Sequence, residues 1–256
     1  MSALKIKQIP CLSDNYGYLV HDPQSGQTTS IDSPDAKAIL AALREEGWTL
    51  SHIWNTHHHF DHIGGNAELV KKTGCKIYAP AGERKMITDA DQYVSEGDQV
   101  SLGAFSARVI ETPGHTLGHA CYIFDEEKSA FVGDTLFSMG CGRLFEGSAE
   151  QMWDSLSKLI ALPDDMLIHP AHEYTADNAR FAASIEPQNQ DLQDRIKQVA
   201  DLRKKNQPTV PMALGLEKKT NPFLRADSKV IRANLKEEGS PDAAVFAHIR
   251  RLKDSF

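Results

Sequence analysis

The sequence predicts an α/β fold that is followed by a smaller, helical domain. Strand-like and helix-like segments alternate up to residue 173, and beyond it only helical patterns continue. A length of 256 residues suits one large domain with a smaller partner. A hydrophobic content of 41% is enough for a sizeable core. We therefore expect one domain over residues 1–173 and a helical domain over residues 174–256.

Short apolar runs bounded by turn residues predict the strands of the first domain. They cover residues 4–9, 16–21, 28–31, 50–55, 76–79, 99–102, 107–111, 120–125, 129–132 and 166–169. The first helix is expected over residues 35–48, where Ala36, Ile39 and Leu43 recur at helical spacing and Gly47 follows as a stop. Further helices are expected over residues 61–72 and 150–162.

Beyond residue 173 the expected helices cover residues 178–185, 189–205 and 242–253. In the middle helix Leu192, Ile196, Val199 and Leu202 form an apolar stripe, which predicts packing against the core of the helical domain. Pro208 marks the start of a loop between helices.

Composition and charge narrow the functional class. The formal net charge of −7 gives no general attraction to nucleic acid or to an anionic membrane. No stretch approaches the ~20 apolar residues of a membrane span, and we expect no signal peptide. The four cysteines, Cys11, Cys75, Cys121 and Cys141, form no CxxC pair, which favours reduced thiols. We expect a cytoplasmic monomer that acts on a small molecule.

The strongest chemical signal is the run HHHFDH over residues 57–62, which follows an apolar strand and precedes a Gly-Gly pair. Alternate side chains of an extended segment share a face, so His57 and His59 are expected to point together. Asp61 and His62 follow where the chain turns into a helix. Imidazole and carboxylate together suit zinc, iron or manganese. The alternative, a surface histidine cluster, does not explain this spacing at the end of a strand.

One hexapeptide cannot complete two metal shells, because each ion needs about three or four protein ligands. His115, Asp134 and His172 each follow a predicted strand, where loops can converge on one site. Taken alone, His115 could be a turn residue and Asp134 a helix cap. Together with the hexapeptide, these residues predict two metal ions, which an aspartate can bridge through its two oxygens.

These motifs resemble the metallo-β-lactamase superfamily and, within it, glyoxalase II, the hydroxyacylglutathione hydrolases. The motifs shared across the superfamily are THHHFDHIGG over residues 56–65, TPGHTLGH over 112–119 and VGDTLF over 132–137. Those more specific to the thioesterase are GCGRLFE over residues 140–146, HEYT over 172–175 and NPFLR over 221–225. The resemblance covers nearly the whole chain. It implies an αββα sandwich that carries the metals, followed by a helical domain that binds glutathione.

The resemblance also implies two divalent metal ions that share a bridging hydroxide. Zinc is the expected metal, and iron and manganese are the alternatives. It assigns to one ion the ligands His57, His59 and His115, to the other Asp61, His62 and His172, and to both the bridging ligand Asp134. Asp61 and Asp134 would be the catalytic carboxylates.

The implied reaction is hydrolysis of S-D-lactoylglutathione, and of other S-2-hydroxyacylglutathiones, to glutathione and D-lactate, within methylglyoxal detoxification. The glutathione-binding positions of the family fall here at Arg143, Phe145, Tyr174, Arg250 and Lys253. Arg143 stands where Lys is common, which keeps the charge but changes the donor geometry. Phe145 stands where Tyr is common, so we expect only an apolar contact from it. The alternative for Arg250 and Lys253 is a solvated helix face.

Several rival functions share the metal motifs. A persulfide dioxygenase would use a similar His/Asp set with one iron. A β-lactamase fits less well, because we expect no export signal and the helical tail differs. A nuclease of the superfamily would need a basic, phosphate-binding surface, which the net charge disfavours. A metal-binding protein without catalysis is the rival from another class.

Overall fold

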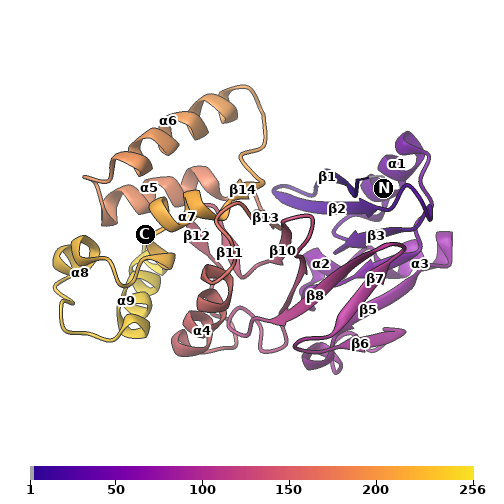
Figure 1. Ribbon diagram of the computed structural model, residues 1–256, viewed down its shortest axis with the longest axis horizontal. Helices are drawn as coiled ribbons and strands as arrows, with labels where there is room; N and C mark the ends of the chain where they lie inside the picture. Colours follow the sequence, from indigo (N-terminus) through magenta and orange to yellow (C-terminus); the bar gives the residue numbers. More distant parts are fainter. Residues whose placement is uncertain (1–2) are drawn as a thin grey trace. The chain divides into compact units, whose positions relative to one another are not determined.

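The computed structural model describes residues 3–256 and divides into two compact units (Figure 1). Unit 1 comprises Met1–Glu111 and Thr116–Gly133, and unit 2 comprises Thr112–His115 and Asp134–Phe256. Strands and helices are present in both, which confirms the α/β class. The boundary expected after residue 173 follows the sequence rather than these compact units, and it stays a prediction.

The first sheet of unit 1 has the strand order β1-β2-β3-β4-β5-β6. Its first three strands are antiparallel, and the pairs from β3 to β6 are parallel. The strands are β1 (Lys5–Cys11), β2 (Asn15–His21), β3 (Thr28–Ile31), β4 (His52–Trp54), β5 (Lys76–Pro80) and β6 (Gln92–Val94). Each parallel pair requires a crossover connection. The loops that contain candidate functional residues follow the ends of β3 and β4.

Two helices cover one face of this sheet. Side chains of α1 (Ala36–Glu46) and α3 (Asn66–Thr73) share a core cluster with those of β2, β4 and β5. The carboxylate of Asp35 caps α1 by accepting from two backbone N–H groups, and Gly47 ends it in the left-handed conformation. Both capping residues lie within the span of residues 35–48 that the sequence predicts.

The helix expected over residues 61–72 is divided into α2 (Phe60–Ile63) and α3. Gly65 interrupts it, because its backbone N–H donates to the carbonyl oxygen of Ser33 at 2.8 Å. A Cβ atom at Gly65 would lie 2.7 Å from that same oxygen, so only glycine permits this approach. The break separates α2, which contains Asp61 and His62, from α3.

The second set of strands in unit 1 is an antiparallel meander in the order β10-β9-β8-β7. Its strands are β7 (Gln99–Leu102), β8 (Phe105–Glu111), β9 (Ala120–Phe124) and β10 (Ser129–Gly133). Trp54 of the first sheet stacks on Phe124 of the meander, with ring centroids 6.0 Å apart, and Tyr18 meets Phe131 edge-on at 5.4 Å. Unit 1 therefore contains two β layers packed face to face, with one helical layer outside them.

Unit 2 is mainly helical. It contains α4 (Ala149–Ile160), α5 (Thr175–Ile185), α6 (Gln190–Lys204), α7 (Leu214–Thr220), α8 (Lys229–Leu235) and α9 (Asp242–Asp254). Two short antiparallel pairs accompany them, β11 (Leu136–Phe137) with β12 (Gly140–Cys141), and β13 (Leu167–Pro170) with β14 (Met212–Ala213). Two short 3₁₀ helices complete the elements, η1 (Ala81–Glu83) in unit 1 and η2 (Pro222–Leu224) in unit 2. Neither α7 nor α8 is among the helices that the sequence predicts.

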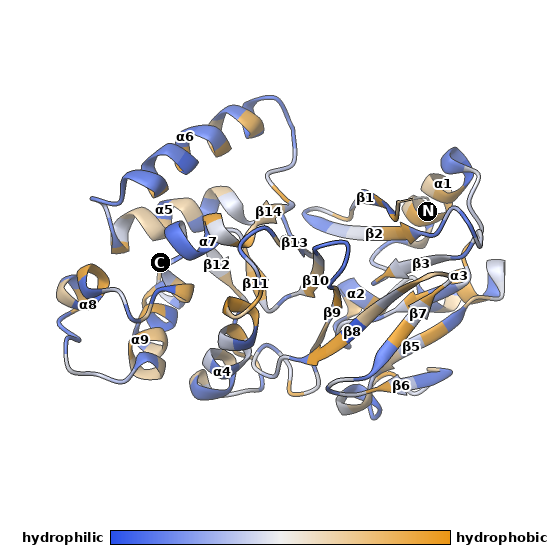
Figure 2. Cartoon of the chain, in the orientation of Figure 1, coloured by the Kyte–Doolittle hydropathy of each residue, from blue (hydrophilic) through white to orange (hydrophobic). Residues whose placement is uncertain are grey.

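The core of unit 2 lies between its helices. Phe223 follows α7 and contacts Phe181 of α5 at 5.8 Å and Phe246 of α9 at 6.0 Å between ring centroids. The helix α6 is mainly hydrophilic with isolated hydrophobic positions (Figure 2). Of its predicted stripe, Leu192 and Val199 are buried in a cluster with α5, which confirms packing as the role of the stripe. No helix among residues 3–256 is both long and apolar enough to cross a membrane.

Candidate metal centre

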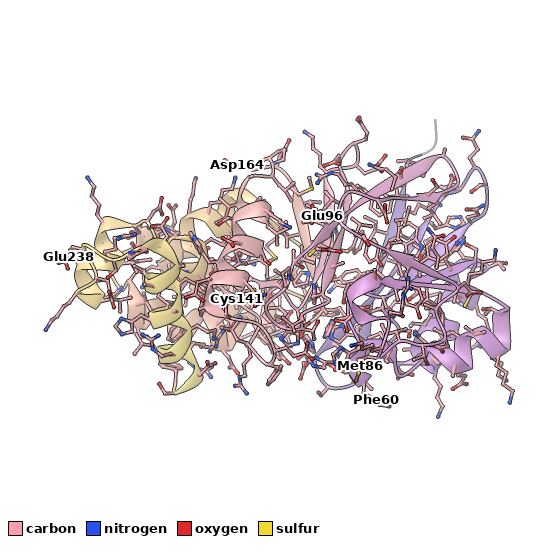
Figure 3. All side chains as sticks on the ribbon, turned by 90° about the horizontal axis from the view of Figure 1, so that it is seen from below. Phe60, Met86, Glu96, Cys141, Asp164 and Glu238 are labelled. Atoms are coloured by element: carbon pink, nitrogen blue, oxygen red, sulfur yellow. The ribbon has the colours of Figure 1, made fainter. Side chains whose placement is uncertain are left out.

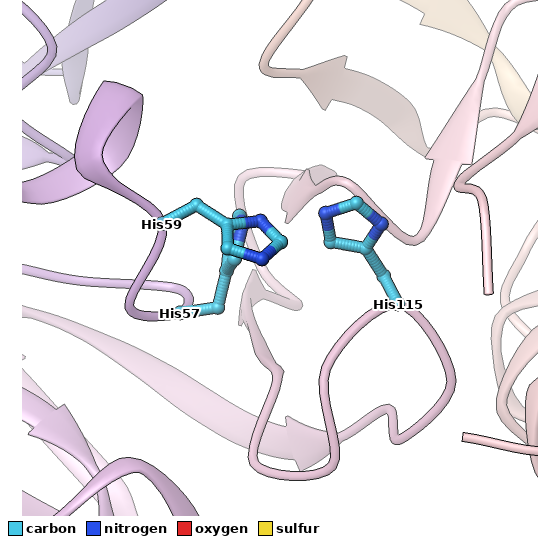
Figure 4. A group of neighbouring side chains, drawn as sticks. All are labelled: His57, His59 and His115. Carbon is cyan, nitrogen blue, oxygen red and sulfur yellow. The ribbon is translucent and has the colours of Figure 1, made fainter. Parts of the chain in front are cut away.

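The histidine motif occupies the loop between β4 and α2 in unit 1. The Nε2 of His57 lies 3.0 Å from the Nδ1 of His59, and both side chains are drawn in Figure 4 together with His115 of unit 2. The rings of His57 and His62 lie 4.0 Å apart. Asp61 Oδ2 lies 3.6 Å from the Nε2 of His62. The structure thus brings all four predicted ligands of this motif together, while the intervening Phe60 is 79% exposed and points outward (Figure 3).

Asp32 supports this loop from the end of β3, and sequence reasoning missed it. Its carboxylate accepts from the backbone N–H of Thr56 at 2.7 Å and from the Thr56 hydroxyl at 2.8 Å. The Nδ1 of His62 lies 2.8 Å from the Oδ2 of the same carboxylate. Asp32 is buried and has a φ of 56°, a strained conformation for a residue other than glycine. An aspartate directly after an apolar strand, as at Asp134, was the available signal.

Asn15 supports Asp61 and was also missed. Its side-chain amide donates to Asp61 Oδ2 at 2.9 Å and to the Asp61 carbonyl oxygen at 3.2 Å. Asn15 begins β2, far from the motif in sequence, so no local pattern marks it. These two hydrogen bonds orient the carboxylate of Asp61.

The other two histidines of the motif regions have neighbours within unit 1. The Nδ1 of His58 lies 2.5 Å from the carboxylate of Glu83, which also accepts from the hydroxyl of Thr116 at 2.5 Å. The ring of His119 is buried and stacks against that of His57 at 4.9 Å. These contacts connect the histidine loop to η1 and to the segment after His115.

Three separate segments of unit 2 supply the remaining predicted ligands. Asp134 lies between two imidazoles, with Oδ2 3.3 Å from the Nε2 of His115 and Oδ1 3.3 Å from the Nε2 of His172. All three side chains are buried. Gly142 permits this arrangement, because a Cβ atom there would lie 1.9 Å from the carbonyl oxygen of Asp134. Each oxygen of Asp134 therefore faces a different imidazole.

The hydrogen bonds of two imidazoles test whether this donor set suits a cation. The Nδ1 of His115 lies 2.8 Å from the carbonyl oxygen of Arg143, which can only accept. The Nδ1 of His62 faces Asp32 in the same way. A proton on Nδ1 leaves Nε2 with its lone pair, and in His115 that nitrogen faces the carboxylate of Asp134. Two electron-pair donors facing each other repel, whereas both would coordinate a cation between them. The residues present fit a metal ion.

The structure places all five predicted substrate-binding residues in unit 2. Three of them lie next to predicted metal ligands. The ring of Tyr174 stacks on His172 with centroids 4.7 Å apart, and Phe145 meets His115 edge-on at 5.2 Å. The guanidinium of Arg143 lies 5.9 Å from the ring centroid of Phe145.

Arg250 and Lys253 lie on α9. Arg250 is buried, with only 6% of its surface exposed, and its Nη1 donates to the carbonyl oxygen of Cys141 at 3.0 Å. The amine of Lys253 donates to the carbonyl oxygen of Asp177 at 3.4 Å. Burial, reinforced by the charge of Arg250, lowers the pKa of Lys253. Arg250 is therefore more enclosed than the solvated helix face that was its alternative.

Family models and a full-length relative indicate the same family for this chain. Residues 28–172 match the model of the "Metallo-beta-lactamase superfamily", and residues 173–256 match that of the "Hydroxyacylglutathione hydrolase C-terminus". The "Hydroxyacylglutathione hydrolase" of Maricaulis maris (strain MCS10) is 55% identical over 256 residues, which is 100% of both chains.

Two solved structures share the fold. The crystal structure of ETHE1 from Myxococcus xanthus has a TM-score of 0.69 at 26% identity, and the match covers 96% of this chain and 90% of that one. TTHA1623, crystallised in a di-iron-bound form, has a TM-score of 0.61 at 25% identity, with 82% and 95% covered. The resemblance read from the motifs is confirmed, and so is the metallo-β-lactamase domain followed by a helical domain. The chain belongs to the hydroxyacylglutathione hydrolases, the glyoxalase II family of the metallo-β-lactamase superfamily.

Proposed function

We propose that this chain is a thioesterase that hydrolyses S-D-lactoylglutathione, and other S-2-hydroxyacylglutathiones, to glutathione and D-lactate. The observation that carries the proposal lies within unit 2. There Asp134 sits between two imidazoles, and residues suited to glutathione lie beside those imidazoles and on α9. The name of the full-length relative supports the same activity.

We assign the seven His and Asp side chains to two metal ions, as the motifs predict. One ion would be bound by His57, His59 and His115, the other by Asp61, His62 and His172, with Asp134 shared. The support is chemical, since all seven side chains are imidazoles or carboxylates, which are ordinary ligands of zinc, iron and manganese.

We propose zinc as the natural metal in both positions. Imidazole nitrogen and carboxylate oxygen are ordinary zinc ligands, and no thiolate is needed. The same ligands accept iron and manganese, and metal supply during growth then decides the occupant. The related protein TTHA1623 holds two irons.

When bound, the two ions would supply Lewis acidity, which lowers the pKa of a shared water and polarises the thioester carbonyl. The chain's residues bind and orient the reactants. Asp61, held by Asn15, accepts a hydrogen bond from the attacking water and directs it. Arg143, Arg250 and Lys253 bind the carboxylates of glutathione through charge-assisted hydrogen bonds. Phe145 packs against the peptide. The leaving thiolate has a pKa of about 8.5, like free cysteine, so no general acid is required.

The deciding experiment combines metal analysis with an assay on the same purified sample. We expect about two metal ions per chain and rapid release of glutathione from S-D-lactoylglutathione. Removing the ions with a chelator should abolish the activity, and adding zinc should restore it. No hydrolysis by the metal-loaded protein would refute the proposal. One iron per chain with oxygen uptake on a glutathione persulfide would instead favour the dioxygenase.

The proposed cellular role is methylglyoxal detoxification, because S-D-lactoylglutathione is the thioester that this process delivers. A cytoplasmic location is supported by the four cysteines, which are all free and buried. The monomeric state stays a prediction, which gel filtration with light scattering would test.

A further inference from the structure

The helix α9 ends in an acidic residue whose position is electrostatically unfavourable. Asp254 is the last residue of the helix, and the other charged residues of this turn, Arg251 and Lys253, are basic. Carbonyl groups concentrate partial negative charge at a helix C-terminus, so a carboxylate there is electrostatically unfavourable. Such a residue needs compensating contacts.

Asp254 contacts two guanidinium groups through one oxygen. Its Oδ1 lies 2.9 Å from the Nη2 of Arg250 and 3.1 Å from the Nε of the same side chain. The Nε of Arg143 lies 3.6 Å from that oxygen. Arg143 belongs to the loop after β12, so Asp254 joins two segments that are far apart in sequence. Both arginines are in the proposed glutathione site.

For Arg250 the carboxylate supplies a necessary counter-charge. The side chain is buried, its guanidinium lies 5.0 Å from the ring centroid of Phe223, and its Nη1 is occupied by the carbonyl of Cys141 (labelled in Figure 3). A buried guanidinium is costly unless it is paired and hydrogen-bonded. Asp254 therefore supplies the ion pair that this buried guanidinium requires and fixes its orientation.

For Arg143 the carboxylate restricts a mobile side chain. The Arg143 side chain is 61% exposed, whereas its backbone carbonyl accepts from the predicted metal ligand His115. Ordering a free arginine side chain costs rotamer entropy. Holding Arg143 before the substrate arrives removes part of that cost from the binding step.

The carboxylate also separates like charges. The charges of Arg143 and Arg250 both lower the pKa of Lys253. These three cations therefore lie in one region of unit 2. Without an anion between them, Arg143 and Arg250 would repel each other, and the exposed side chain of Arg143 would move away.

We propose that Asp254 is a positioning residue that holds Arg143 and Arg250 together as one receptor for the carboxylates of glutathione. This inference rests on the proposed function. Asp254 acts through the two arginines and takes no part in the reaction at the thioester.

The test is the variant Asp254→Asn, which keeps the size of the side chain but removes its charge. We expect the KM for S-D-lactoylglutathione to rise about tenfold, which is about 1.4 kcal/mol, while kcat changes by less than about twofold. The matched control is Asp194→Asn, an exposed aspartate of α6 that pairs with Lys197 at 3.1 Å, and its KM should stay unchanged.

A second substrate separates positioning from a structural role. The D-lactoyl thioester of N-acetylcysteamine has no carboxylate, so its kcat/KM should be the same in Asp254→Asn and in the wild type. An equal loss on both substrates would overturn the inference in favour of a structural effect. An unchanged or lower KM for the glutathione thioester would also overturn it, because Asp254 would then be idle or would compete with the substrate. If the wild type does not hydrolyse S-D-lactoylglutathione, the proposed function fails instead.

Discussion

The two units hold their predicted metal ligands in contrasting ways. In unit 1 all four predicted ligands come from one hexapeptide, and buried side chains such as Asp32 and Asn15 orient them. In unit 2 the three predicted ligands come from three separate segments, and a backbone carbonyl, that of Arg143, orients His115. Unit 2 also carries every residue that we propose for glutathione binding.

This difference has a functional consequence. A loop held by side chains such as Asp32 and Asn15 can be loosened by one substitution without affecting the residues proposed to bind substrate. In unit 2 the same segment, from Asp134 to Arg143, contains both a predicted metal ligand and a cationic residue that we propose for substrate binding. We therefore expect substitutions in unit 1 to affect metal binding and kcat, and substitutions in unit 2 to affect substrate affinity as well.

The largest effect is expected for Asp134→Ala, because this carboxylate faces two imidazoles with separate oxygens. Activity should fall by about 1,000-fold or more, and the metal content should drop below that of the wild type. Metal analysis beside the thioesterase assay measures both. Full activity with normal metal content would show that Asp134 is not the shared ligand.

A smaller effect is expected for Asp32→Asn, which removes the charge of the carboxylate that contacts Thr56 and His62. Residues that orient a metal-binding histidine typically change metal affinity or activity about 10- to 100-fold when substituted. We expect kcat/KM to fall within that range and the KM to stay close to the wild-type value. The readouts are steady-state kinetics and retention of metal during dialysis.

The matched control for Asp32→Asn is Asp22→Asn. Asp22 is also buried in unit 1, and its carboxylate accepts from the backbone N–H groups of Gln24 and Ala104. Its substitution should lower stability without changing metal retention. If both variants lose metal equally, the specific role of Asp32 is refuted.

The same contrast explains what could be predicted from the sequence. The predicted ligands of unit 1 lie within one hexapeptide, so their spacing alone was sufficient to predict that their side chains lie close together, as the structure shows. Their supports were missed because Asp32 and Asn15 approach the motif only through the fold. The elements β6 and β14 contain three and two residues, which is too short for an alternating pattern to appear. The helix expected over residues 61–72 was wrong as one element, because the approach of Gly65 to Ser33 is a tertiary contact.

A third prediction concerns the hairpin β11–β12, which lies between Asp134 and Arg143. The fully buried carboxylate of Glu217 accepts from the hydroxyl of Ser138 at 2.9 Å and from the backbone N–H of Met139 at 2.7 Å. Glu217→Ala would leave these donors without an acceptor and should lower the free energy of unfolding by about 3 kcal/mol. Urea denaturation measures this loss.

The comparison variant is Glu217→Gln, which keeps one carbonyl acceptor and should lose less stability than Glu217→Ala. Equal stability of the wild type and Glu217→Ala would show that the hairpin does not depend on this carboxylate. An intact fold with a raised KM would extend the contrast between the units, since it would link the hairpin to substrate binding through Arg143.

The smallest effect is expected from pH at Lys253. Burial, with a contribution from Arg250, lowers the pKa of its amine, so the positive charge is lost at a lower pH than in an exposed lysine. Only the protonated amine attracts a carboxylate, and therefore the KM for S-D-lactoylglutathione should rise as the pH increases, beginning below the ordinary lysine pKa of about 10.4. In Lys253→Arg the guanidinium stays charged throughout this range, so that rise should disappear. A rise of equal size in the variant would assign the titration to another group and would count against Lys253 as one of the residues of unit 2 that bind glutathione.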